Sequence, residues 1–149
     1  MSSPAGGAAI PEQPARRFGA SIPRFAGTTS VLYEGRDESG LVLVKVIRDN
    51  ALPSPADKQR IQRELQKIAL IQHPALPRII GVGEENGRLW IAREFVDGES
   101  LSERLSRNGP MSVPEAARIA ASIAAAVGEL HRLGVLHQYN QIPKKVRDL

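Results

Sequence analysis

The run Leu41-Val-Leu-Val-Lys-Val-Ile47 constrains the fold of this 149-residue chain more than any other stretch. β-Branched and apolar residues fill the run, which predicts a β-strand buried on at least one face. Lys45 is the exception, because a lysine within an apolar strand must extend to water or meet an anion. Two interpretations remain open here: a lysine that protects an edge strand from aggregation, or a lysine that binds a negatively charged group.

Composition narrows the classes of protein. Apolar residues make up 42% of the chain and aromatic residues 4%, so an aliphatic core is feasible. Cysteine is absent, which excludes disulfides and cysteine metal sites and suits a cytoplasmic protein. His73, His131 and His137 form no close pair at metal-ligand spacing, so no metal site is expected. The net charge of +4 is scattered, without a basic run interleaved with aromatic residues, so nucleic-acid binding is not expected.

Neither a membrane-spanning segment nor a signal peptide is expected from the sequence. The longest apolar run of the second half, residues 119–127, is far shorter than the roughly 20 residues that span a bilayer. Residues 1–14 lack the basic start and apolar centre of a signal peptide. Their Ala, Gly, Pro and Ser content predicts a disordered tail over residues 1 to about 16.

Strand and turn signals follow from residue 17 onward. The candidate strands are residues 18–25 (a poor one, interrupted by Pro23), 30–35, 41–47, 78–82 and 88–92. The turn-rich residues 36–40 predict a hairpin between the second and third of these strands. Asn86-Gly87 is a strong signal for a type I′ turn between the last two. We therefore expect four or five antiparallel strands.

Three helices are predicted from their caps. Ser54-Pro55-Ala-Asp57 begins the first, which must end before Pro74. Residues 101–107 form a short polar helix that ends at Asn108-Gly109. Ser112-Val-Pro-Glu115 is a capping box that begins an alanine-rich helix, for which Gly134 is the natural stop.

The order of these elements resembles the N-terminal half of a protein kinase domain, most closely the eukaryotic-like (Hanks-type) bacterial serine/threonine kinases. The matching motifs are Val42-Leu-Val-Lys45, Arg63-Glu64-Leu65 followed by His73-Pro74, the stretch Trp90–Leu101 with its Gly-Glu-Ser-Leu ending, and Glu129–His137. The resemblance implies an α+β fold. Residues 17–97 would be a kinase-like N-lobe, with about five antiparallel strands and one C helix. Residues 98–137 would be the first two helices of the helical C-lobe.

The resemblance also implies ATP-dependent phosphoryl transfer to protein hydroxyls, with roles for five positions. Lys45 would contact the α- and β-phosphates, and Glu64 would hold Lys45 by an ion pair. Gly27 would be the surviving glycine of the phosphate-binding loop, and the backbone around Glu94 and Val96 would bind adenine. For Glu64 the alternative is a solvated acid at the edge of an apolar helix face.

Several residues depart from the family pattern around the nucleotide. Phe25 and Ser30 flank the loop that retains only Gly27, and their side chains would obstruct close backbone approach to phosphates. Leu43 replaces a small residue above adenine and would narrow the slot. Arg93 falls at the rear of the slot, where a buried cation needs an anion. We expect Arg93 to reach Glu64 and compete with Lys45; the alternative is an exposed Arg93.

The last residues of the chain, from His137 onward, depart most from the family pattern. His137-Gln138-Tyr139 stands where the family has His-Arg-Asp, and Lys144 stands at the place of its metal-binding asparagine. The expectation is a truncated kinase-like domain without activity, with residues 138–149 foreign to the family. These departures do not favour ATP binding, and magnesium is not expected. The alternatives are a pseudokinase-like protein-binding module and a non-functional gene remnant.

A partner surface is predicted on the last helix. Residues 113–133 carry an apolar stripe that the rest of a helical lobe would cover in a complete kinase, made of Val113, Ala116, Ile119, Ile123, Val127 and Leu130. Left exposed, such a stripe predicts self-association or a protein partner. No membrane contact is expected.

Overall fold

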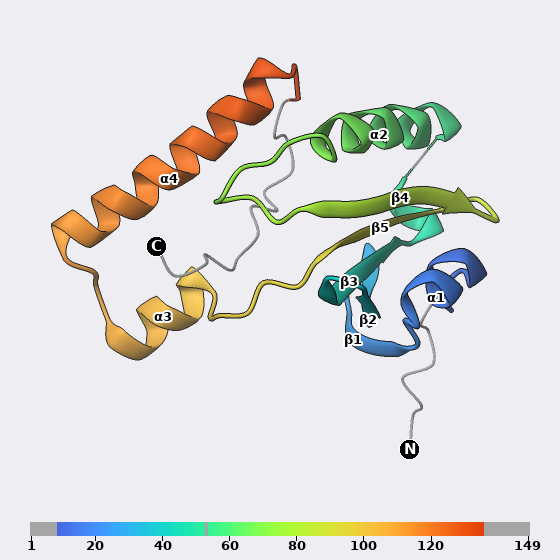
Figure 1. The fold of residues 1–149 in the computed structure, drawn as a ribbon, viewed down its shortest axis with the longest axis horizontal. Coiled ribbons are helices and arrows are strands. Elements are labelled where there is room, and N and C mark those ends of the chain that lie inside the picture. The colour runs from blue at the N-terminus through green and yellow to red at the C-terminus, as the bar shows by residue number, and fades with distance from the viewer. Residues whose placement is uncertain (1–8, 53, 136–149) are drawn as a thin grey trace. The chain divides into compact units, whose positions relative to one another are not determined.

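A five-stranded antiparallel sheet with the order β1-β2-β3-β5-β4 forms the centre of the first of two compact units. The structure is a computed structural model that describes residues 9–52 and 54–135 (Figure 1). Its strands are β1 (Ile22–Ala26), β2 (Ser30–Asp37), β3 (Gly40–Ile47), β4 (Ile79–Glu85) and β5 (Arg88–Glu94). The predicted α+β class and antiparallel sheet are confirmed.

Both predicted hairpins form. β2 and β3 pair from Ser30 opposite Ile47 down to Asp37 opposite Gly40, and the Asp37 carboxylate accepts from the Ser39 backbone N–H at 2.8 Å. In the β4–β5 turn, Asn86 and Gly87 both have positive φ, 52° and 78°. Positive φ at both central residues matches the twist of antiparallel strands, which is why this dipeptide predicted the turn.

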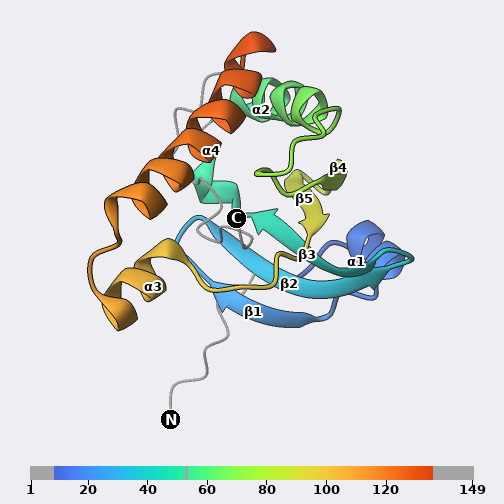
Figure 2. The same cartoon turned by 60° about the vertical axis from the view of Figure 1, so that its left-hand side comes forward.

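One face of the sheet carries the core. Along β3, Val42, Val44 and Val46 are fully buried and alternate with half-buried residues, as the period of a strand requires. They join Val31 and Tyr33 of β2 and Trp90 and Ala92 of β5 in one hydrophobic cluster. Figure 2 shows β1, β2 and β3 lying side by side along this sheet.

The N-terminal helix α1 (Glu12–Phe18) corrects the predicted disordered tail, because its first five residues lie inside the segment expected to be disordered. Pro14 and Phe18 are buried, and the Phe18 ring meets Trp90 edge-on with centroids 6.2 Å apart. Polar, proline-rich composition concealed this helix, since a seven-residue helix depends on tertiary packing rather than on its own propensity. Residues 1–8 lie outside the described part.

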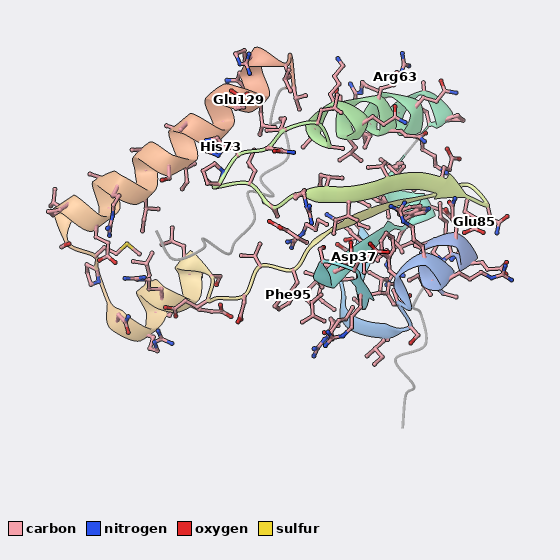
Figure 3. The ribbon with its side chains drawn as sticks, viewed as in Figure 1. Asp37, Arg63, His73, Glu85, Phe95 and Glu129 are labelled. Carbon is pink, nitrogen blue, oxygen red and sulfur yellow. The ribbon has the colours of Figure 1, made fainter. Side chains whose placement is uncertain are left out.

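A charged contact fixes the start of α1. The backbone N–H of Gln13 donates to the Glu85 carboxylate at 2.7 Å, and Figure 3 places Glu85 at the end of β4 beside α1. The helix ends where Gly19 adopts φ 56°, a left-handed conformation that glycine adopts without penalty.

The poor strand candidate that Pro23 interrupts forms β1, an exposed strand at the edge of the sheet. β1 pairs with β2 with an irregularity between Pro23 and Phe25, and all five of its residues are exposed. Proline is tolerated here because an edge strand has one row of backbone groups that needs no partner. Ile22 and Phe25 are 65% and 62% exposed.

The helices begin and end close to the predicted residues. They are α2 (Pro55–Ile68), α3 (Leu101–Asn108) and α4 (Val113–Arg132), and a 3₁₀ turn lies at Asp49–Ala51. Ser54 caps α2 by accepting from the Asp57 backbone N–H at 3.2 Å. Ser112 likewise accepts from Glu115, but the Glu115 carboxylate is ion-paired with Arg104. Figure 1 shows α1 and α2 on opposite sides of the sheet.

The second compact unit comprises Leu70–Arg78 and the described residues from Val96 onward. The first unit ends at Phe95, whereas the predicted N-lobe runs to residue 97 and includes residues 70–78. The Arg132 side chain lowers the pKa of Glu129 of α4 most, and His73 of the first segment of this unit lowers it further. No described helix is long and apolar enough to cross a membrane.

The apolar stripe of α4 is less exposed than expected. Ile119 and Leu130 are 9% and 5% exposed, and Ile123 and Val127 are half-buried. Val113, at the start of the helix, is 82% exposed. The prediction of a bare stripe is therefore wrong over most of its length, while the predicted self-association stays a prediction.

Candidate functional site

The second face of the sheet holds the residues that the sequence singled out. Lys45 lies opposite Ile91, and Leu43 lies opposite Arg93, in the antiparallel pairing of β3 with β5. Residues that are directly opposite each other point to the same face, so these four side chains share the face that the core residues leave free. Lys45, Leu43 and Arg93 are all half-buried.

Burial and a second cation both act on Lys45. Burial lowers the pKa of Lys45, and the Arg93 guanidinium lowers this pKa further. Burial also lowers the pKa of Arg93, while the Glu94 carboxylate raises it. Two cations therefore share one half-buried face, and the Arg93 guanidinium makes the charged form of Lys45 less favourable.

Glu64 does not take the position expected for it. It lies half-buried on α2, and none of the ion pairs between described residues joins it to Lys45 or to Arg93. The hypothesis that Arg93 reaches Glu64 is therefore wrong. The Arg93 Nη1 instead donates to the Glu94 carbonyl of the same strand at 3.4 Å.

The loop between β1 and β2 is closed on itself. The Gly27 N–H donates to the Ser30 carbonyl at 2.8 Å, and the Arg48 side chain donates to the Gly27 carbonyl at 3.0 Å. A Cβ built on Gly27 would lie 3.1 Å from the Phe25 ring. A phosphate-binding loop needs backbone N–H groups that point at the ligand, whereas the Gly27 N–H is already used. Arg48, which makes this clamp, was missed because nothing in its sequence position signals a loop contact.

The segment after β5 is also hydrogen-bonded. The Phe95 backbone N–H donates to the Leu41 carbonyl at 2.9 Å (Figure 3 labels Phe95 beyond β5). The Glu94 carbonyl already accepts from Arg93. Val96 is 4% exposed and belongs to the second unit. Tyr139 lies outside the described residues.

Comparison with known proteins identifies the family. A model of the protein kinase domain matches residues 26–138. The chain belongs to the protein kinase domain family. The probable serine/threonine-protein kinase PknB of Lactococcus lactis is 33% identical over 115 residues, which cover 75% of this chain and 18% of that protein. The kinase PrkC of Bacillus subtilis is 30% identical over 97 residues, 65% of this chain and 15% of that protein.

Solved structures agree on the fold. The kinase domain of Mycobacterium tuberculosis PknI superposes with a TM-score of 0.72 at 24% identity, covering 93% of this chain and 55% of that one. The chain thus spans less than a fifth of the length of the curated relatives named above and about half of a kinase domain. Within the family, the sheet and α2 correspond to the expected N-lobe, which confirms the resemblance.

Proposed function

We propose that this chain is a member of the protein kinase family that acts by binding and does not itself transfer phosphoryl groups. One observation carries the proposal: Glu64 takes part in none of the ion pairs between described residues, while burial and the Arg93 guanidinium both lower the pKa of Lys45. Active kinases require the ion pair between this strand lysine and the helix glutamate, because it holds the lysine against the phosphates. Here that ion pair is not among those of the described residues, and the Arg93 guanidinium disfavours the charged form of the lysine.

Two further features support the proposal. The closed loop at Gly27 has its N–H directed to Ser30 and its carbonyl held by Arg48, so it offers little to a phosphate chain. In the sequence, Tyr139 stands at the family's catalytic aspartate, and a phenol with an ordinary pKa near 10 is a poor acceptor for a hydroxyl proton at neutral pH. A role for ATP would then rest on contacts with its phosphates, without a magnesium requirement.

A phosphoryl-transfer assay tests the proposal. The chain is incubated with γ-labelled ATP, magnesium or manganese, and a basic acceptor protein, beside the Lys45→Met variant. Incorporation into the acceptor or into the chain itself should equal that of Lys45→Met. Incorporation that exceeds this background and depends on Lys45 would overturn the proposal. Circular dichroism of both proteins confirms that they are equally folded.

A further inference from the structure

The turn between β4 and β5 holds one of the two Asn-Gly pairs of the chain. Asn86 and Gly87 are both exposed at the tip of this hairpin, where they connect Glu85 to Arg88 (Figure 1). Within the part of the chain that the structure describes, the Gly87 N–H has no hydrogen-bond acceptor, because it lies in the turn and outside the strand pairing. The backbone nitrogen that follows Asn86 is therefore not held by a hydrogen bond.

The second pair, Asn108-Gly109, provides a matched comparison. It lies at the end of α3, where the Gly109 N–H donates to the Leu105 carbonyl at 2.9 Å. The Asn108 Oδ1 also accepts from the Arg107 Nε at 3.2 Å. Asn108 is exposed, as Asn86 is. The two pairs thus share a sequence and access to water, and they differ in whether the nitrogen after the asparagine is hydrogen-bonded.

We propose that Asn86 is a site of spontaneous deamidation in the folded chain. The Gly87 nitrogen loses its proton to solvent base and attacks the side-chain carbonyl carbon of Asn86, which closes a succinimide ring and expels ammonia. Water then opens the ring at one of its two carbonyls and leaves isoaspartate or aspartate. Glycine has no side chain to hinder the attack, and an exposed hairpin tip opens locally at low cost. The modification does not depend on the proposed function.

The modified turn is also a contact point for α2. The Lys58 side chain of this helix donates to the Gly87 carbonyl. Isoaspartate adds a methylene group to the backbone of a two-residue turn, which moves that carbonyl, and either product places a new carboxylate next to Glu84 and Glu85. Deamidation therefore releases Lys58 from the turn and loosens the start of α2 from the hairpin tip.

Timed incubation of the whole chain at mildly alkaline pH, followed by brief trypsin digestion and mass spectrometry, tests the modification. Trypsin releases residues 79–88 and 108–118, so each peptide reports on one Asn-Gly pair. We expect Asn86 to deamidate about three- to tenfold faster than Asn108, the effect of one backbone hydrogen bond on the opening that attack requires. In denaturant the two rates should become similar. Samples taken at zero time correct for deamidation during digestion.

Two results would overturn the proposed site. One is an Asn86 that deamidates no faster than Asn108 in the folded chain. The other is a difference in rate that persists unchanged in denaturant, because it would then come from the neighbouring sequence and not from the fold.

The release of α2 has a separate readout. Acylation of Lys58 by a water-soluble ester should be faster in the deamidated chain, whereas acylation of Lys67, an exposed lysine of the same helix, should not change. In Asn86→Gln, incubated in parallel, Lys58 should keep its initial rate because glutamine closes the corresponding ring far more slowly. Equal Lys58 rates before and after deamidation would refute the release of α2.

Discussion

The two faces of one sheet differ in kind, although alternate residues of the same strands build them. On one face Val42, Val44 and Val46 are fully buried in a core with Trp90. On the other, Lys45 and Arg93 are half-buried, and burial lowers the pKa of each. The first face gains stability from apolar burial, and the second gives stability up by holding two like charges together. Apolar burial on the core face therefore offsets the free energy that the charged face loses.

The largest expected effect is on the core face. Trp90 is 2% exposed and contacts Phe18 of α1, so Trp90→Ala removes the side chain that joins helix and sheet. Such truncations cost about 3–5 kcal/mol, which is a large share of the stability of a small domain. Chemical denaturation should show this loss or an unfolded protein. A loss below about 1 kcal/mol would mean that α1 does not depend on this contact.

A glycine beneath the tryptophan should give the next largest effect. A Cβ on Gly83 would lie 2.5 Å from the Trp90 ring, so Gly83→Ala should lower the free energy of unfolding by about 1–3 kcal/mol through overpacking. The matched control is Gly128→Ala in α4, where the added Cβ meets nothing within 4 Å; it should stabilise by about 0.5–1 kcal/mol. If the Gly83 effect persists in the Trp90→Ala background, the ring is not its cause.

The core face and its turns were largely predictable from sequence because they depend on local rules. Alternation in β3 and the Asn86-Gly87 turn specify their own geometry, and Ser54 caps α2 as its position predicted. Helix α1 was not predictable in the same way. Its stability comes from burying Phe18 against residues far away in the chain, and its composition gives no sign of this.

The sequence predicted where the charged residues of the second face lie, but it did not predict which charges they meet. Lys45 and Arg93 were singled out by their occurrence in apolar strands, and the register of β3 with β5 brings them to one face. Which charge Lys45 meets depends on how α2 is placed over the sheet, and no local pattern encodes that placement. The expected pair with Glu64 therefore rested on the family resemblance alone, and in the structure the Arg93 guanidinium is one of the charges that act on Lys45.

On the charged face, removing a cation should stabilise the protein. Lys45→Met keeps the length of the side chain and removes a charge that burial, and then the Arg93 guanidinium, make unfavourable, so we expect a gain of about 1 kcal/mol. The pKa of Lys45 is lower in the folded protein than its ordinary 10.5, so the charged lysine destabilises the fold at neutral pH. This penalty should disappear as the pH rises through the folded pKa toward 10.5, and with it the advantage of the variant.

Denaturation of both proteins from neutral pH to about pH 10.5 measures this difference. Only the difference between the two proteins is informative, because the pKa of Tyr33 is raised by burial and its ionisation destabilises the fold in the same range. A variant that is less stable than the parent at neutral pH would show that Lys45 has a stabilising partner in the folded chain.

The smallest effect is expected at the open edge of the charged face, where opposite charges meet. Arg24 of β1 is ion-paired with Glu34 of β2, and the arginine side chain is 61% exposed. A double-mutant cycle with Arg24→Met and Glu34→Gln should give a favourable coupling of about 0.2–0.5 kcal/mol that high salt removes. The same cycle with Lys45→Met and Arg93→Met should give a coupling of the opposite sign that salt reduces less, because these cations are half-buried. Couplings of the same sign in the two cycles would mean that the charged face is uniform, and that Lys45 and Arg93 do not repel each other in solution.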